Sequence, residues 1–196
     1  MHLLTVSGFL GSGKTTFILK LAEAAVQRNF KVAILVNEIG DIGIDNQLMR
    51  QLDLNVWQLL AGCICCSLRK DLPGTLQKLV DDYSPDLVLL EPSGAANLQK
   101  VLFTLFNQQG TPIVSHRTVV IVDPLRLEKL ITVLTPLINS QIDHADLVLI
   151  NKIDVAKDEE LKNSAKIISN FKNNGKVFCM SAKETIEPAL LMELLP

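Results

Sequence analysis

Residues 3–16 read LLTVSGFLGSGKTT, and this stretch decides the fold. Leu3–Ser7 is a short apolar run that predicts a buried strand, and a helical pattern follows from about Lys14 to Arg28. Between them, Gly8–Thr15 matches the pattern G-x-x-x-x-G-K-[ST]. This pattern predicts a phosphate-binding P-loop when it follows a strand and opens a helix, as it does here.

The rest of the chain repeats this alternation of apolar runs and helical segments. Further strands are predicted at residues 32–36, 56–60, 87–91, 118–123, 147–151 and 176–180, and helices at 72–82 and 158–171. Strand–helix alternation implies parallel strands with right-handed crossovers. We therefore predict an α/β fold of the P-loop NTPase type: an open, mostly parallel sheet with helices on both faces. Residues 1–196 are expected to form a single domain.

Composition excludes several classes of partner. The 196 residues carry a net charge of -2 and no basic tract, so nucleic acid and anionic membrane surfaces are not expected partners. No apolar run is long enough to span a bilayer, and the N-terminus runs directly into the first strand without a signal peptide. We expect a cytoplasmic protein, in which thiols stay reduced or bind metal.

The P-loop predicts which residues hold the nucleotide phosphates. Lys14 is expected to reach the β- and γ-phosphates and to act in catalysis, and the Thr15 hydroxyl is expected to bind Mg²⁺. The backbone of the loop and the N-terminus of the helix supply the remaining donors. The predicted phosphate site comprises Gly8, Gly11, Ser12, Gly13, Lys14, Thr15 and Thr16.

Two later motifs favour guanine as the base. NKID (Asn151–Asp154) follows the strand at 147–151, and SAK (Ser181–Lys183) follows the last strand. A carboxylate at Asp154 can accept from guanine N1–H and the 2-amino group together, whereas adenine would leave it unpaired. Lys152 is expected to lie along the base and the Ala182 amide to donate to guanine O6. The combination predicts GTP rather than ATP.

The stretch LVLLEPSG (87–94) supplies the next expected part of the site. Glu91 ends a strand and Gly94 follows three residues later, where GTPases place a carboxylate near Mg²⁺ and a glycine near the γ-phosphate. Most GTPases use Asp at this point; Glu91 is longer, and either binds Mg²⁺ through water or orients the attacking water. Asp123 is either a second carboxylate facing the site or a cap for the helix after Pro124.

At this point the motifs resemble a known family. GFLGSGKTT, VNEIGDIGID (36–45), GCICC (62–66), EPSG, NKID and SAK occur in the order and approximate spacing of the CobW-like GTPases, which are related to the hydrogenase and urease nickel-insertion GTPases. The resemblance covers nearly the whole chain. It implies a GTPase metallochaperone that binds a transition metal together with GTP and uses hydrolysis to release the metal to a client metalloprotein.

The chain departs from the family pattern in three places. Ala61-Gly62 stands where Gly-Gly is common, and Ile39 stands where an aromatic residue is common. The family's second, C-terminal domain is expected to be absent. We therefore expect the partners to include a client, and either a second copy of this chain or a separate protein that supplies that domain.

Three cysteines, Cys63, Cys65 and Cys66, form the expected transition-metal site. Thiolates favour Zn²⁺, Co²⁺, Ni²⁺ or Cu⁺, and zinc is the first expectation. Glu38 is the first candidate for a fourth ligand. If γ-phosphate orders residues 37–45 as a switch, the ligands assemble only with GTP bound. Buried core cysteines, a redox pair and an iron–sulfur cluster shared across a dimer stay open as alternatives.

The alternative function is a nucleotide-dependent regulatory or scaffolding switch, in which the cysteines hold structural zinc or sense redox state. Cys179 lies inside an apolar strand and is expected in the core, and His2, His116 and His144 are not assigned to the site. No arginine falls at an obvious position to act as an internal arginine finger. The expected hydrolysis of GTP to GDP and phosphate is therefore slow without metal, dimerisation or a client.

Overall fold

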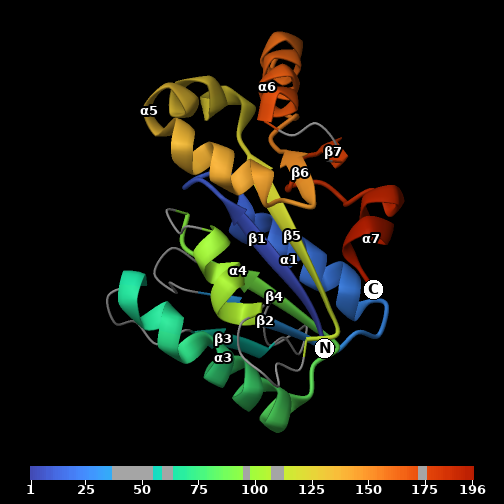
Figure 1. The fold of residues 1–196 in the computed structure, drawn as a ribbon. Coiled ribbons are helices and arrows are strands. Elements are labelled where there is room, and N and C mark those ends of the chain that lie inside the picture. The colour runs from blue at the N-terminus through green and yellow to red at the C-terminus, as the bar shows by residue number, and fades with distance from the viewer. Residues whose placement is uncertain (37–54, 59–63, 95–97, 107–112, 172–175) are drawn as a thin grey trace.

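The chain forms one twisted sheet between two layers of helices (Figure 1). The computed structural model describes residues 1–36, 55–58, 64–94, 98–106, 113–171 and 176–196, with the backbone alone for 55–58 and 64–71. The strands are β1 (His2–Gly8), β2 (Val32–Val36), β3 (Asn55–Gln58), β4 (Leu87–Glu91), β5 (Ser115–Val122), β6 (Leu147–Ile150) and β7 (Lys176–Cys179). The helices are α1 (Lys14–Val26), α3 (Ile64–Tyr83), α4 (Leu98–Phe106), α5 (Pro124–Asp143), α6 (Asp158–Phe171) and α7 (Pro188–Leu194).

All seven described strands run parallel, in the order β3-β2-β4-β1-β5-β6-β7. β1, the strand that leads into the P-loop, therefore lies in the middle of the sheet between β4 and β5. Both of its neighbours belong to later parts of the chain, so each connection crosses over a face of the sheet. This arrangement confirms the predicted α/β fold and its parallel sheet.

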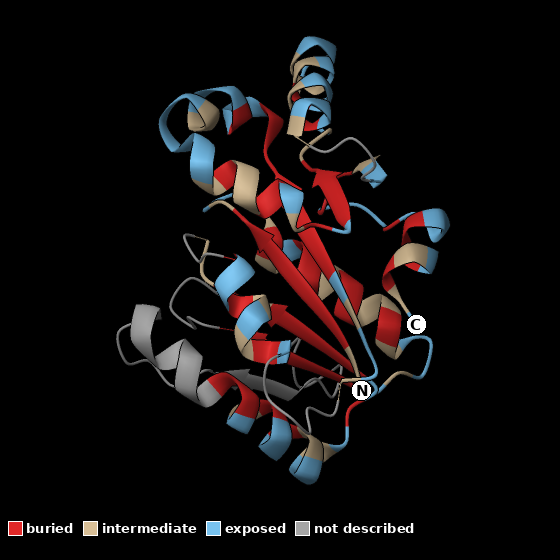
Figure 2. Cartoon of the chain, viewed as in Figure 1, coloured by how far each residue is buried: buried red, intermediate tan, exposed pale blue. Residues whose placement is uncertain are grey.

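Alternation along the strands separates two cores. On one face, Leu4 and Val6 of β1 pack with α1 and α7. On the other face, Leu3 packs with α3 and α4, and the β5–β6 half of that face packs with α5 and α6. Because side chains point alternately to opposite faces of a strand, apolar runs without polar breaks are what a doubly covered sheet needs. Figure 2 shows the resulting band of buried residues along the sheet.

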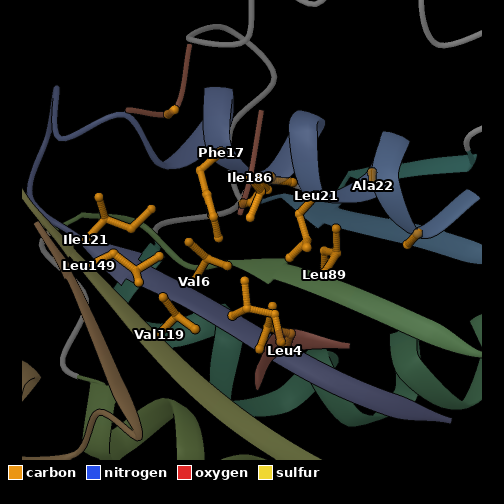
Figure 3. Close-up of a cluster of buried hydrophobic side chains, with 14 of the residues drawn as sticks. Leu4, Val6, Phe17, Leu21, Ala22, Leu89, Val119, Ile121, Leu149 and Ile186 are labelled. Atoms are coloured by element: carbon orange, nitrogen blue, oxygen red, sulfur yellow. The ribbon is translucent and has the colours of Figure 1, made fainter. Parts of the chain in front are cut away.

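Helix α1, which follows the P-loop, packs on the sheet. Phe17 and Leu21 are fully buried and point down onto Val6 and its neighbours (Figure 3). Phe17 and Leu21 are four residues apart and therefore lie on one face of the helix. Two turns of α1 are thereby fixed on the sheet directly after the loop, so the helix N-terminus has a defined position above the end of β1.

The carboxyl ends of four adjacent strands bring the motifs together. Gly8 ends β1, Glu91 ends β4, Asp123 follows β5 and Asn151 follows β6. The register places Gly8 beside Ile121 and Val122 beside Ile150, so these ends lie at one edge. Ligands of open parallel sheets bind outside this edge.

Several element boundaries differ from the sequence-based expectation. α3 begins at Ile64 rather than near Leu72 and holds Pro73 inside it, where a helix start had been expected. The reason lies in the sequence: Ile64 and Leu68 extend, at a spacing of four, the stripe that continues at Leu72 and Leu76. β5 begins at Ser115 rather than 118. The helix at 158–171 is confirmed, and Leu59 and Leu60 of the expected third strand lie outside the described residues.

The prediction that Cys179 lies in the core is wrong, because Cys179 is exposed. β7 is an edge strand that pairs only with β6 in the described sheet, and most of its residues are exposed. An apolar run does not distinguish an edge strand from a central one. None of the helices in the described ranges is both long enough and apolar enough to cross a bilayer.

Candidate functional site

The P-loop turns at three glycines that have positive φ. Gly8, Gly11 and Gly13 have φ of 140°, 77° and 96°. The Ser12 amide donates to the Phe9 carbonyl at 3.1 Å and closes the loop. Positive-φ residues in a turn can direct successive backbone N–H groups toward one point and so form an anion-binding concavity. Gly13 is also the N-cap of α1 and brings no capping side chain, which leaves the N-terminal N–H groups of the helix open to an anion.

Lys14, Thr15 and Glu91 converge beside this loop. The Thr15 hydroxyl donates to the Glu91 carboxylate, at 3.0 Å to Oε2 and 3.2 Å to Oε1. The Lys14 ammonium lies 3.9 Å from Glu91 Oε1 and donates to the Phe9 carbonyl at 3.3 Å. Lys14 is 7% exposed and Glu91 14%. A hydroxyl and a carboxylate at this separation are the kind of oxygen ligands that Mg²⁺ prefers.

Gly94 packs directly on the P-loop backbone. A Cβ at this position would lie 3.1 Å from the Gly8 carbonyl oxygen and 3.1 Å from the Leu10 amide nitrogen. The Gly94 carbonyl accepts from the side-chain amide of Gln141 at 3.3 Å, and Gln141 is 1% exposed. The E-x-x-G loop is therefore held against the phosphate loop from one side and by a buried residue of α5 from the other.

Asn151 joins two loops of the site. Its Nδ2 donates to the Ser12 carbonyl at 2.7 Å, and its Oδ1 accepts from the Ala182 amide at 2.8 Å. The side chain is 2% exposed, and a Cβ at Gly13 would lie only 2.3 Å from its Nδ2. Glycine is therefore required at position 13 for space as well as for φ. Because the Ala182 amide is used by Asn151, the expectation that it donates to guanine O6 does not fit this geometry.

Lys152 adopts a left-handed conformation, with φ of 64°, and its ammonium donates to Asp123 Oδ2 at 2.7 Å. Asp123 also accepts from the Leu125 amide at 3.0 Å as the N-cap of α5. Of the two roles considered for Asp123, the helix cap is confirmed. The carboxylate additionally holds Lys152, so it links the strand ends of β5 and β6.

The Asp154 carboxylate is fixed by the SAK loop. Its Oδ1 accepts from the Ser181 hydroxyl at 3.0 Å, and its Oδ2 accepts from the Lys183 ammonium at 3.3 Å. The Ser181 hydrogen bond is the main cause that holds the pKa of Asp154 below its ordinary value, with Lys183 adding to it. An ionised carboxylate held at the exposed end of β6 suits a base that presents two N–H donors.

The expected metal ligands are described only in part. Cys65 and Cys66 lie in the first turn of α3, which is described by its backbone, and Cys63 and Glu38 lie outside the described residues. Within the ranges that the structure describes with side chains, no group of three His, Cys, Asp or Glu residues could hold a metal ion. The three histidines hydrogen-bond elsewhere, to Ser115, to Thr5 and to Ser140.

Two residues at the site were not identified from the sequence. Gln141 is buried inside α5, far from any motif, and Arg126 lies in the first turn of the same helix. Arg126 Nη1 donates to the Leu10 carbonyl at 3.3 Å, and a Cβ at Gly11 would lie 3.0 Å from that nitrogen. One local feature could have indicated the position of Arg126: it follows Asp123, a capping residue, by three positions and therefore lies in the first turn of a helix. Thr16 lies in the first turn of α1 and is exposed.

The comparisons with known proteins agree with this geometry. The family model described as the nucleotide-binding domain of CobW/HypB/UreG matches residues 2–179. The zinc chaperone YeiR of Escherichia coli is 35% identical over 150 residues, which cover 76% of this chain and 45% of that protein. The zinc chaperone YjiA of the same organism is 29% identical over 165 residues, which cover 79% of this chain and 50% of that protein.

Solved structures show the same fold. The crystal structure of Zn(II)-bound YjiA GTPase has a TM-score of 0.70 at 21% identity, and covers 97% of this chain and 60% of that one. A triple mutant of YjiA, also Zn(II)-bound, has a TM-score of 0.69. The chain spans about half the length of the curated relatives it matches. With its P-loop, its paired Thr15 and Glu91 and its NKID loop in place, the chain belongs to the CobW/HypB/UreG family.

Proposed function

We propose that this domain binds GTP with Mg²⁺ and hydrolyses it to GDP and phosphate. The observation that carries the proposal is the contact of Thr15 with Glu91 beside the Lys14 ammonium. The Ser12 hydroxyl adds support, because it is buried in the P-loop with no hydrogen-bond partner among the described residues. A buried orphan hydroxyl is costly unless a ligand completes it.

Each residue of the phosphate site has a chemical role in this proposal. Lys14 neutralises charge on the β- and γ-phosphates, and the N–H groups of the P-loop and of α1 bind their oxygens. The Thr15 hydroxyl and the Glu91 carboxylate hold Mg²⁺, which supplies positive charge against the phosphate oxygens when it is bound. In this proposal the backbone amide of Gly94 donates to the γ-phosphate, and the close approach of Gly94 to the Leu10 amide supports this role.

Guanine is the base that this site favours. The ionised Asp154 carboxylate, held by Ser181, matches the N1–H and 2-amino donors of guanine. Since Asn151 occupies the Ala182 amide at 2.8 Å, we assign the contact with O6 to the amide of Lys183, whose own contact with the Ser181 hydroxyl oxygen is longer, at 3.4 Å. Asp154→Asn should weaken GTP binding at least tenfold and leave any ATP binding unchanged, in a fluorescence titration with labelled nucleotides. Equal loss for both nucleotides would contradict the assignment.

The second half of the proposal is a transition-metal cargo bound by Cys63, Cys65, Cys66 and Glu38. The support is the thiolate chemistry of the C-x-C-C sequence, together with relatives that are named as zinc chaperones. Zinc is the first candidate, and Co²⁺ or Ni²⁺ would suit the same ligands. Glu38 follows β2 by two residues, and Val36 at the end of β2 pairs with Glu91 in β4. In this proposal the segment that follows Val36 acts as a switch that couples hydrolysis to release of the cargo and its delivery to a client protein.

The experiment is a Co²⁺ titration of the reduced protein, read by thiolate-to-metal absorption. It is run with GDP and with a non-hydrolysable GTP analogue. Zinc binding alone would be a poor readout, since a YjiA triple mutant is also Zn(II)-bound. Cys65→Ser should abolish the absorption. Cys179→Ser is the matched control and should retain the absorption. Desolvation raises the pKa of the Cys179 thiol, so this thiol stays protonated near neutral pH and is a poor metal ligand.

The outcomes separate metal delivery from the alternative function. Tighter Co²⁺ binding with the GTP analogue than with GDP would support a cargo released on hydrolysis. Equal affinity in both nucleotide states would favour a regulatory switch with structural zinc. Absence of thiolate absorption in the wild-type protein would remove the cysteine site and leave only the GTPase.

A further inference from the structure

Helix α5 begins against the phosphate loop and presents an arginine to it. Arg126 Nη1 donates to the Leu10 carbonyl at 3.3 Å. An ideal Cβ at Gly11 would lie 3.0 Å from this nitrogen, and no other described residue beyond the neighbours of Gly11 in the chain would come within 4 Å of it. The guanidinium therefore lies on the turn formed by Leu10 and Gly11, and the missing side chain of Gly11 leaves room for it.

The position of Arg126 is fixed by buried groups. Asp123, which is 5% exposed, caps the first turn of α5 through the Leu125 amide and accepts from Lys152 at 2.7 Å. Pro124 occupies the first turn, where its fixed φ suits a helix start. The Arg126 amide donates to the Asp123 carbonyl at 3.1 Å. The backbone from which the guanidinium extends is thus anchored to the ends of β5 and β6.

Charge pairing distinguishes Arg126 from the lysines of the site. Lys14, Lys152 and Lys183 each have a carboxylate oxygen within 4 Å. Arg126 is exposed and pairs with no carboxylate among the residues that the structure describes. Its guanidinium donates instead to the Leu10 carbonyl, and a neutral carbonyl is a weak partner for a cation. An arginine held at a phosphate-binding loop without a carboxylate retains its donors for an anion. Guanidinium binds phosphate oxygens through two parallel N–H donors.

We infer that Arg126 is an internal arginine that moves from the Leu10 carbonyl to the β- and γ-phosphates of bound GTP and promotes its hydrolysis. The inference rests on the proposed GTPase function. In the reaction, water forms a bond to the γ-phosphorus while the bond from the γ-phosphorus to the bridging oxygen breaks. GDP leaves with that electron pair, and the proton of the water ends on phosphate. The guanidinium donates to the oxygens on which negative charge develops.

The test compares Arg126→Ala and Arg126→Lys with the wild-type protein. Lys129→Ala is the matched control, because it removes an exposed cation one turn further along α5. Single-turnover hydrolysis should fall at least tenfold in Arg126→Ala and remain low in Arg126→Lys, since an ammonium cannot form the two parallel bonds. Added guanidinium ion should partly restore Arg126→Ala. GDP affinity should stay within about twofold of wild type, while affinity for GDP with aluminium fluoride should fall at least tenfold.

Two results would overturn the inference. One is hydrolysis by Arg126→Ala at the wild-type rate. The other is an equal loss of affinity for GDP and for GDP with aluminium fluoride, which would make Arg126 a brace for the loop and nothing more. A wild-type protein that binds GTP without hydrolysing it would instead refute the proposed GTPase. Arg126 would then be tested by the ratio of the protein's affinity for a GTP analogue to its affinity for GDP. Arg126→Ala should lower this ratio, and Lys129→Ala should not.

Discussion

Replacing Asn151 with alanine should destabilise the protein and weaken nucleotide binding together. The Asn151 side chain is 2% exposed and makes two hydrogen bonds, to the Ser12 carbonyl at 2.7 Å and from the Ala182 amide at 2.8 Å. Both partners are backbone groups in loops that contribute to the site. Truncation therefore leaves a carbonyl and an amide without their partner at a buried position.

The size of the effect follows from these two groups. An unsatisfied buried backbone group costs about 1–3 kcal/mol, so two cost about 2–6 kcal/mol. Water that enters the space left by the amide recovers part of this cost. We expect the free energy of unfolding to fall by about 2–4 kcal/mol, measured by urea denaturation monitored by circular dichroism. GDP affinity should fall at least tenfold in a titration with fluorescent nucleotide, because the P-loop and the SAK loop lose their common anchor.

Asn170→Ala is the matched control, since Asn170 is an exposed asparagine on α6. It should change the free energy of unfolding by no more than about 0.5 kcal/mol and leave GDP affinity unchanged. The reasoning would be refuted if Asn151→Ala behaved like this control. A loss of stability with wild-type GDP affinity would refute the coupling of the two loops and leave only the burial argument.

Three further predictions concern the same edge of the sheet. GTP affinity should be higher in Mg²⁺ than in EDTA, and Glu91→Gln should abolish this difference. Glu184→Gln, which changes an exposed glutamate, is the control. An unchanged Mg²⁺ effect in Glu91→Gln would exclude Glu91 as a ligand. Gln141→Leu should lower the free energy of unfolding by about 1–2 kcal/mol, because the Gly94 carbonyl loses its donor, whereas the exposed Gln77→Leu should cost less than about 0.5 kcal/mol. The pKa of Asp154 is lowered from 3.8, so its contribution to stability is complete above that pH and is lost as pH falls through the lowered pKa. The difference in unfolding free energy between wild type and Asp154→Asn should therefore be constant between about pH 7 and about pH 5, and should shrink only below about pH 4. A difference that changes between about pH 7 and about pH 5 would contradict the lowered pKa.

The sheet could be predicted because its strands are buried on both faces. Runs such as LVLLE and LVLI are short, apolar and bounded by turn residues, which favours buried strands, and each was expected within a few residues of its observed bounds. The helix that starts at Ile64 was expected only from Leu72, and Pro73 lies inside it. Leu72 and Leu76 are buried against β2 and β4, and this packing outweighs the disruption that Pro73 brings to the helix.

The P-loop, Glu91 and the NKID loop could be predicted because their residue types and spacing are dictated by phosphate, metal and base. Arg126 and Gln141 could not be, since their roles depend on where α5 lies relative to the P-loop. That relation is set by the order of strands in the sheet, which no local pattern encodes. The placement of Cys179 failed for the same reason: whether β7 is central or at the edge is a property of the whole sheet.

The central place of β1 has a consequence for synthesis on the ribosome. β1 precedes both of its neighbours in the chain, and they begin at Leu87 and Ser115. The P-loop therefore emerges well before its flanking strands, which are complete only once Val122 has been made. Asn151 and Ala182, which complete the clamp on Ser12, emerge later still. Such long-range pairing folds slowly, so nascent chains expose unpaired apolar strands before they can bind nucleotide. GTP can thus stabilise the finished domain and gives no help to the growing chain.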